Sequence, residues 1–169
     1  MSSGSFTVMA KRKKRRPAMR RTIQNPDPVL PGHVSAMRSV PAEIPRPDYA
    51  ERGVPIRTSP DSLRKDTATI GRMREAGSAA RRILRKVASH VAPGITTEEL
   101  DQICHESCIK EGGYPSPLNY NGYPKSLCTS INEIICHGIP DSRALKDGDI
   151  VNCDVTIFLD GVHGDHSET

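Results

Sequence analysis

The stretch that decides the fold is residues 152–169, "NCDVTIFLDGVHGDHSET". Within residues 150–159, "IVNCDVTIFL", apolar and polar residues alternate from 151 to 157, which is the period of a β-strand with one buried face. The pair Asp160-Gly161 is typical of a two-residue hairpin turn, because both central positions of such a turn have positive φ. We therefore predict an antiparallel hairpin, with its second strand over residues 162–169.

Two aspartates lie on the polar face of this predicted hairpin. Asp154 shares that face with Asn152 and Thr156. With a two-residue turn, Asp154 is opposite Ser167 and Asp165 lies one diagonal step away, whereas a longer loop would place the aspartates directly opposite each other. Either register separates them by roughly 4.5–8 Å. Only a one-residue slip would turn Asp165 onto the apolar face.

Neighbouring carboxylates repel each other, and a cation between them removes that penalty. Hard oxygen ligands on adjacent strands suit a divalent ion, and one carboxylate can bridge two ions about 3.5–4 Å apart. A solvated hairpin face, or pairing of an acid with a lysine, is the alternative that geometry alone leaves open. His163 shares the face of Asp165 and could bind a metal or support a ligand, whereas His166 should point to the opposite side.

A long helix is predicted upstream of the strands, from Lys65 to the Pro-Gly pair at residues 93–94. Apolar or small residues recur there at steps of three and four, which indicates one buried stripe. The arginines and lysines of this stretch take the other faces. The predicted stripe comprises Ile70, Met73, Gly77, Ala80, Leu84, Val87 and Val91.

Thr96 and Glu99 have the spacing of a capping box, which predicts that a second helix starts there and continues to Gly112. Cys104 and Cys108 lie four residues apart in this helix, with a histidine next to the first. These residues could indicate a metal site. We favour a buried helix face, because no second ligand pair follows at the spacing of a zinc site.

Short strands are expected between the second helix and the hairpin. The segments "SLCTSI" (126–131) and "EIIC" (133–136) have the composition of strands, and residues 137–149 are expected to form a loop. Two helices followed by antiparallel strands predict an α+β domain, with the helices on one face of an antiparallel sheet.

Charge is divided unevenly along the chain. Residues 1–60 hold 12 Lys and Arg against 4 Asp and Glu, and residues 61–169 hold 12 against 16. Residues 1–24 contain no acid and include six contiguous cations, so we expect a disordered basic tail. Its segment 11–21 could contact a polyanion such as ribosomal RNA. A solvated tail and an organellar presequence are the alternatives.

The proline-rich residues 25–64 are expected to form an extended linker that lies across the chain's own domain, with a ligand for a partner domain as the alternative. Residues 65–169 form the predicted folded domain. No apolar run approaches the ~20 residues that span a bilayer. The sequence has no signal-peptide core after the basic cluster, so we expect a cytoplasmic protein, with organellar import as the alternative. The five cysteines have no regular spacing, so we expect a reducing compartment and no disulfide framework. We also expect a monomer.

The run "YPKSLCTSINEIICHGIP" (123–140), followed by D-V-T at 154–156 and H-G-D at 163–165, resembles the type I methionine aminopeptidases. The similarity covers roughly residues 40–169. It implies a metallopeptidase of the pita-bread fold, of which this chain holds the N-terminal half. The implied reaction is removal of the initiator methionine from the N-termini of nascent polypeptides by a two-metal hydrolase.

The resemblance also implies roles for single residues. Asp154 would bind one of two divalent ions, which could be Co, Mn, Fe or Zn, and Asp165 would bridge both. His137 would contact the substrate and assist at the scissile peptide without binding metal. A polarizable thioether suits an apolar cup of tyrosine rings and a thiol, although core packing would use the same residue types. The implied methionine pocket comprises Pro117, Tyr120, Tyr123 and Cys128.

Two features depart from the family's pattern. His166 stands where threonine is common, and we expect a tolerated change because the residue alternates to the back face. The family completes its metal site with one histidine and two glutamates from its second half, whereas this chain ends at Thr169. We therefore expect a fragment that is inactive alone. Another pita-bread peptidase, or a non-catalytic scaffold that binds ribosomes or nucleic acid, are the alternative functions.

Overall fold

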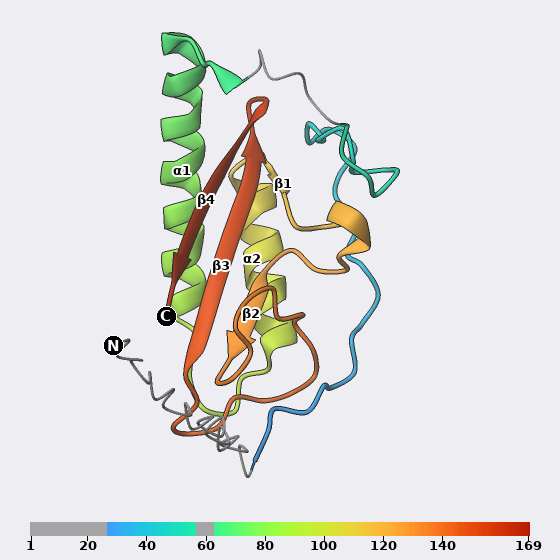
Figure 1. The fold of residues 1–169 in the computed structure, drawn as a ribbon, viewed down its shortest axis with the longest axis vertical. Coiled ribbons are helices and arrows are strands. Elements are labelled where there is room, and N and C mark those ends of the chain that lie inside the picture. The colour runs from blue at the N-terminus through green and yellow to red at the C-terminus, as the bar shows by residue number, and fades with distance from the viewer. Residues whose placement is uncertain (1–26, 57–62) are drawn as a thin grey trace, which may run out of the picture.

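The protein was analysed as a computed structural model that describes residues 27–56 and 63–169, and its elements form two layers (Figure 1). The basic segment 1–24 lies outside these residues. Within them, two helices pack on one face of a four-stranded antiparallel sheet, so the predicted α+β architecture is confirmed. The helices are α1 (Thr67–Ala88) and α2 (Thr97–Lys110). The strands are β1 (Tyr114–Pro115), β2 (Cys128–Ile131), β3 (Val151–Leu159) and β4 (Val162–Glu168), and a 3-10 turn, η2 (Tyr120–Gly122), precedes β2.

Strand β3 is the centre of the sheet. It pairs along one edge with β4, and its other edge pairs with β1 near one end and with β2 near the other. Leu159 is opposite Val162, so the turn has two residues. Asp160 and Gly161 have φ of 50° and 79°, as such a turn requires. The predicted hairpin is confirmed, in the first of the two registers considered.

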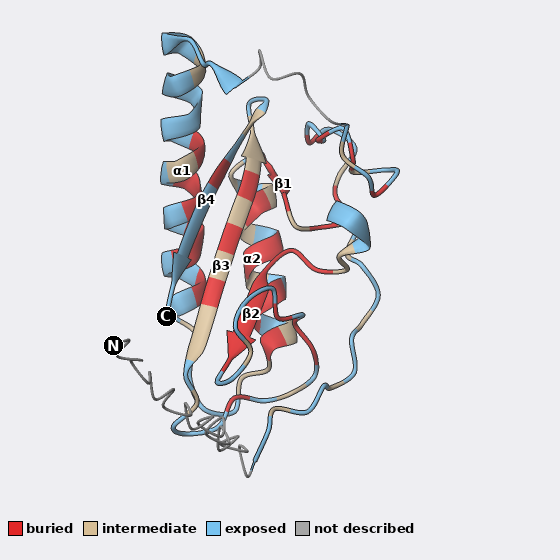
Figure 2. Ribbon diagram, in the orientation of Figure 1, coloured by how far each residue is buried: buried red, intermediate tan, exposed pale blue. Residues whose placement is uncertain are grey.

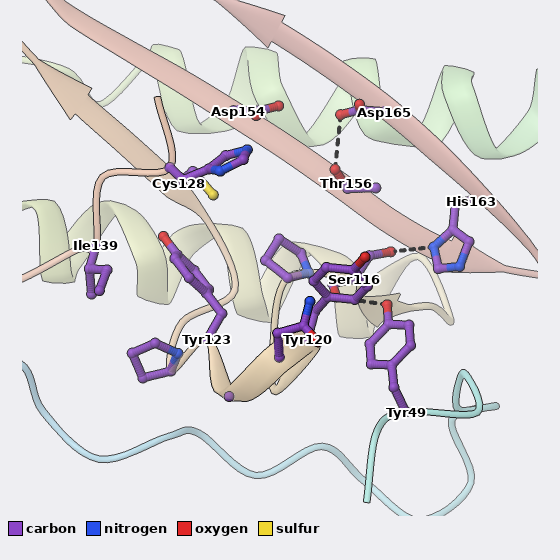
Figure 3. Close-up of a pocket in the computed structure, with 15 residues that line it drawn as sticks. Tyr49, Ser116, Tyr120, Tyr123, Cys128, Ile139, Asp154, Thr156, His163 and Asp165 are labelled. Carbon is purple, nitrogen blue, oxygen red and sulfur yellow. Dashed lines mark hydrogen bonds between the residues drawn. The ribbon is translucent and has the colours of Figure 1, made fainter. Parts of the chain in front are cut away.

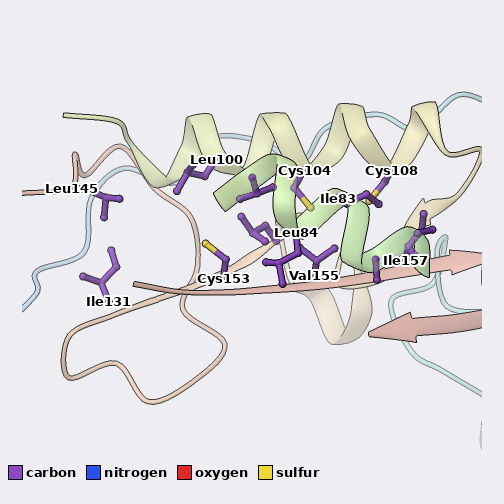
Figure 4. Close-up of a cluster of buried hydrophobic side chains, with 14 residues drawn as sticks. Ile83, Leu84, Leu100, Cys104, Cys108, Ile131, Leu145, Cys153, Val155 and Ile157 are labelled. Carbon is purple, nitrogen blue, oxygen red and sulfur yellow. The ribbon is translucent and has the colours of Figure 1, made fainter. Parts of the chain in front are cut away.

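The core lies between the helices and the apolar face of β3 (Figure 4). Figure 2 shows the buried residues on the sides of α1 and α2 that face the sheet. Cys153, Val155 and Ile157 of β3 are buried, as the period of two predicts, whereas Val151 and Leu159 on the same face are half-buried. The main cluster includes Ile83, Leu84, Val87, Leu100, Cys104, Cys108, Leu127, Val155 and Ile157.

Helix α1 begins after Asp66, whose side chain accepts a hydrogen bond from the Thr69 amide at 2.7 Å. Part of the predicted stripe is wrong. Ile70 and Met73 are 39% and 41% exposed, because the first turns of α1 extend past the end of the hairpin (Figure 1). Val91 lies beyond the helix and is 37% exposed. The residues that α1 does bury are Ala76, Ala79, Ala80, Ile83, Leu84 and Val87.

Helix α2 carries the predicted capping box. Cys104 and Cys108 are in the core, and all five cysteines of the chain are free thiols. His105 is buried, with Nδ1 hydrogen-bonded to Ser126 Oγ at 2.8 Å and Nε2 to the Ser39 carbonyl at 3.1 Å. Burial lowers the pKa of His105. Since both imidazole nitrogens have partners, this helix face is structural.

The prediction of a strand over residues 133–136 is wrong. Strand β2 ends at Ile131, because Asn132 adopts a φ of 50° and turns the chain out of the sheet. The side-chain oxygen of Asn132 accepts a hydrogen bond from the Ile150 amide at 3.0 Å, which holds this turn against the start of β3. Ile135 is then 94% exposed. Apolar composition gave no indication of this turn.

Residues 27–56 run along the domain rather than away from it (Figure 1). The Gly32 amide donates to Asp141 at 2.6 Å, and Arg38 donates to Glu98 on α2 at 2.8 Å. A second small cluster, Val40, Ile44, Tyr114 and Leu118, joins this segment to the region around β1. None of the helices in the described ranges has the length and apolar composition needed to cross a membrane.

Candidate functional site

A pocket of about 780 Å³ opens on the polar face of the β3–β4 hairpin (Figure 3). It is bounded by the hairpin, the loop around η2, the loop after β2 and residue Tyr49. All seven residues predicted for the site line it, although they come from separate segments of the chain. These residues are Pro117, Tyr120, Tyr123, Cys128, His137, Asp154 and Asp165.

The two aspartates lie diagonally across the hairpin. Asp154 is opposite Ser167, and Asp165 is opposite Thr156, whose hydroxyl donates to Asp165 Oδ1 at 2.9 Å. Burial and the negative charge of Asp165 raise the pKa of Asp154. No salt bridge in the described part of the chain involves either carboxylate, so the alternative of an acid–lysine pair is not seen there.

This acidic pair fits a divalent cation. Its donors are hard carboxylate oxygens on adjacent strands, and a cation would relieve the repulsion that raises the pKa of Asp154. Within residues 27–56 and 63–169, no group of three or more His, Cys, Asp and Glu could hold a metal. Asp154 and Asp165 are the two carboxylates among the residues that line the pocket.

The loop after β2 presents His137 to the pocket. His137 has a φ of 54°, and the next residue, Gly138, is buried against β2. The Gly138 carbonyl accepts hydrogen bonds from the Thr129 amide at 2.9 Å and the Tyr123 hydroxyl at 2.8 Å. A Cβ atom at Gly138 would lie 2.0 Å from the Thr129 carbonyl oxygen, so this approach requires glycine. The backbone that follows His137 is thus fixed against β2 and Tyr123.

The predicted side-chain pocket is uncharged and polarizable. Burial raises the pKa of Tyr123 far above its ordinary value and raises that of Cys128 to about 11. Both groups are therefore protonated at neutral pH. The single hydroxyl hydrogen of Tyr123 is shared between the Gly138 carbonyl at 2.8 Å and the Leu127 carbonyl at 3.1 Å, and these contacts fix the ring beside Cys128. Such a surface suits a thioether or another apolar side chain.

Other residues also line the pocket. Thr156 and His163 lie on the polar face, as strand alternation predicts, and His166 is opposite Val155 on the side toward α1. Ser116 Oγ is hydrogen-bonded to His163 Nδ1 at 2.9 Å, and burial lowers the pKa of His163. Sequence reasoning missed Tyr49, because its segment has no periodic pattern that connects it to the hairpin. The remaining lining residues are Asn121, Gly122, Pro124 and Ile139.

Comparison with known proteins gives consistent matches. Residues 71–169 match metallopeptidase family M24. Methionine aminopeptidase 1A of Arabidopsis thaliana is 53% identical over 141 residues, covering 80% of this chain and 35% of that protein. The chloroplastic methionine aminopeptidase 1B of the same plant is 45% identical over 167 residues, covering 99% of this chain and 45% of that protein.

A solved structure shows the same fold. The crystal structure of methionine aminopeptidase from Rickettsia prowazekii superposes with a TM-score of 0.60 at 48% identity. The match covers 61% of this chain and 42% of that one. The expected pita-bread fold is confirmed for the part that is covered. The chain spans less than half the length of each of these relatives.

Proposed function

The chain belongs to metallopeptidase family M24, and we propose that it carries part of a methionine aminopeptidase site that removes the initiator methionine from nascent polypeptides. The observation that supports this most is the convergence of all seven predicted residues on one pocket. The pocket has an acidic end on the hairpin and an apolar end between Tyr123 and Cys128 (Figure 3). An N-terminal methionine has the complementary groups, a cationic amine and a thioether.

We assign Asp154 and Asp165 to the binding of divalent cations, and in the complete enzyme of two such ions. Co, Mn, Fe and Zn all suit these donors. When bound, these ions polarise a peptide carbonyl and lower the pKa of a water molecule. The hydrogen bond from Thr156 fixes the carboxylate of Asp165 and leaves its second oxygen for a ligand. The carboxylates also attract the substrate's free amine.

His137 would hydrogen-bond the peptide next to the scissile bond, from the side of the loop after β2. Pro117, Tyr120, Tyr123 and Cys128 would hold the methionine side chain away from water. Because the loop of His137 and the ring of Tyr123 are joined through the Gly138 carbonyl, the apolar end and the reacting end of the pocket keep a fixed separation.

Cobalt titration of the 169-residue chain tests this assignment. We expect Co²⁺ binding, and we expect Asp154→Asn and Asp165→Asn each to weaken it by at least the roughly 10- to 100-fold that loss of an outer-shell partner costs, because each removes a direct charged donor. Isothermal titration measures the affinity. Asp160→Asn is the matched control, since Asp160 is an exposed turn residue outside the pocket and asparagine is favoured in this turn.

The same samples test the substrate. A Met-Gly dipeptide should bind to the cobalt-loaded chain, but no methionine should be released, because the described residues contribute only two carboxylates to the centre. Measurable release with cobalt or manganese would contradict this expectation. Equal cobalt affinity in all three variants would refute the assignment of the two aspartates.

We also propose that segment 11–21 binds the ribosome through RNA phosphates. Deletion of residues 1–24 should abolish co-sedimentation with ribosomes at low salt, and the binding of the intact chain should fall steeply as salt rises. Salt-independent binding, or binding that survives the deletion, would contradict the proposal. We propose a cytoplasmic monomer, in keeping with the five free thiols. Relatives with organellar names make import the alternative to test.

A further inference from the structure

One wall of the pocket comes from outside the sheet and the helices. Tyr49 lies in the segment that precedes α1, and it is only 4% exposed. Figure 3 shows its ring on a separate segment of the chain, on the side of the pocket opposite the hairpin. The residue is in the pocket lining, but the proposed roles of the other lining residues do not include it.

Tyr49 contacts two pocket side chains at once. Its ring meets the ring of Tyr120 edge to face, with centroids 5.1 Å apart and planes at 85°. It also lies nearly parallel to the imidazole of His163, with centroids 6.3 Å apart and planes at 13°. The edge-to-face arrangement is favourable because the positive edge of one ring meets the negative face of the other. Tyr49 is thus packed between a residue of η2 and a residue of β4.

The hydroxyl of Tyr49 adds a third contact. It donates to the Ser116 carbonyl at 2.7 Å, and the side chain of Ser116 is hydrogen-bonded to His163 Nδ1 at 2.9 Å. Burial raises the pKa of Tyr49 well above its ordinary value, so the hydroxyl remains a donor. His163 is therefore held by stacking on Tyr49 and by a serine whose backbone Tyr49 also fixes.

The loop that carries Tyr120 depends on the same segment. Asn119 Nδ2 donates to the Ala50 carbonyl at 2.9 Å, and the Asn121 amide donates to the Gly53 carbonyl at 2.7 Å. Both asparagines have positive φ, 61° and 50°. Asparagine adopts this left-handed conformation more readily than most residues, and these two hydrogen bonds hold both asparagines in it. Residues 49–53 supply these contacts on both sides of Tyr120.

We propose that Tyr49 is a positioning residue for the side-chain pocket. It fixes the ring of Tyr120 and the imidazole of His163, and so sets the width of the pocket to suit an unbranched apolar side chain rather than an aromatic one. The segment before α1 is therefore part of the machinery that selects the first residue of the peptide. This inference rests on the proposed function for its ligand, but its structural part can be tested without a ligand.

Three variants of the full chain separate positioning from simple stability. Tyr49→Ala removes all contacts, and Tyr49→Phe keeps the ring but loses the hydrogen bond to Ser116. Tyr114→Phe is the matched control, because the Tyr114 hydroxyl makes a similar buried hydrogen bond, to the Leu118 carbonyl at 2.9 Å, outside the pocket. The readouts are the NMR signals of the Tyr120 ring and the His163 imidazole, thermal unfolding, and the affinities of the cobalt-loaded chain for Met-Gly and Phe-Gly.

Tyr49→Ala should shift the NMR signals of Tyr120 and His163. It should weaken Met-Gly binding about three- to tenfold, which corresponds to the free energy of one aromatic pair. Phe-Gly binding should be unchanged or stronger. Tyr49→Phe should shift the His163 signals and leave Tyr120 in place. Tyr114→Phe should lower thermal stability without changing the pocket signals or the preference for Met-Gly.

Unchanged Tyr120 and His163 signals in Tyr49→Ala, or equal shifts in the Tyr114→Phe control, would overturn the proposal. An unchanged Met-Gly to Phe-Gly ratio would also overturn it if the wild-type chain binds Met-Gly. Failure of the wild-type chain to bind Met-Gly would instead count against the proposed function. The NMR signals would then still decide whether Tyr49 positions the two side chains.

Discussion

Gly164→Ala is expected to lower the free energy of unfolding by about 3 kcal/mol, the upper range for overpacking a close-packed interface. Gly164 lies on β4 where the strand crosses α1. A Cβ atom there would lie 2.1 Å from the Ala76 carbonyl carbon and 2.4 Å from the Gly77 amide nitrogen. Because these atoms are backbone, the clash can be relieved only by moving the strand away from the helix. Urea unfolding followed by circular dichroism measures the loss.

Gly71→Ala is the control for this prediction. Gly71 lies in α1, the helix that Gly164 approaches, and a Cβ atom at Gly71 would have no other atom within 4 Å. Alanine should raise stability by about 0.5–1 kcal/mol, because glycine loses more backbone entropy in a helix. The two glycine substitutions should therefore act in opposite directions. Gly164→Ala should also weaken cobalt binding, since Asp165 is the next residue of β4. Equal stability of the two variants would mean that β4 does not depend on this contact.

Lys125→Met is expected to destabilise the fold by about 3 kcal/mol, the low end for breaking a buried ion pair, because Arg38 still compensates part of the charge of Glu98. The Lys125 side chain is completely buried and pairs with Glu98 of α2. Its ammonium group also donates to Ser35 Oγ at 2.7 Å, and Arg38 pairs with Glu98 at 2.8 Å. These contacts join the segment before α1, helix α2 and the chain leading into β2. Asp101 reinforces the junction by accepting hydrogen bonds from two amides that follow Lys125.

The pH dependence of this effect has a defined direction. Burial by itself would raise the pKa of Glu98, but the hydrogen bonds from Lys125 and Ser35 and the charges of Lys125 and Arg38 outweigh it and lower that pKa. The ionised carboxylate therefore stabilises the fold above its unfolded pKa of about 4.5, and this contribution is lost as the pH falls through the lower folded value.

Urea unfolding of the wild-type chain and of Lys125→Met at pH 7 and at pH 3.5 measures this dependence. The difference in free energy of unfolding between the two proteins should be smaller at pH 3.5 than at pH 7. Lys146→Met is the matched control. Lys146 pairs with Asp27 at 3.5 Å on the surface, where such pairs contribute about 0–1 kcal/mol. A loss as small in Lys125→Met as in Lys146→Met would show that the buried junction carries no net stability.

The hairpin could be predicted from sequence because strand geometry is local. The alternation around Asp154 and the Asp-Gly turn left two registers, both of which place Asp165 on the same face as Asp154, and the structure has the one with the two-residue turn. The capping box at Thr96 and Glu99 was equally local and was found where predicted. The family resemblance then brought the η2 loop and His137 to the same site, which no periodicity could have done.

Non-local contacts account for what sequence reasoning missed. Residues 134–136 are apolar, but the turn at Asn132 depends on a hydrogen bond from the Ile150 amide at the start of β3. Ile70 and Met73 fit a helical stripe, but their exposure depends on where the hairpin ends beside α1. Tyr49 reaches the pocket only because its segment folds back over β1 and η2.

The two ends of the pocket differ in how far apart in the chain their residues lie, and this should give them different folding times. Asp154 and Asp165 are joined by a single hairpin, a structure that forms in about 1–10 μs once its strands can pair. At the other end of the pocket, the hydrogen bond between Tyr49 and Ser116 joins residues 67 positions apart in the chain. The hydrogen bond between Ser116 and His163 joins residues 47 positions apart. Contacts between such distant residues form later in folding. The carboxylates would therefore meet before the wall encloses them, and a divalent ion present during folding would encounter its donors while the pocket is still open.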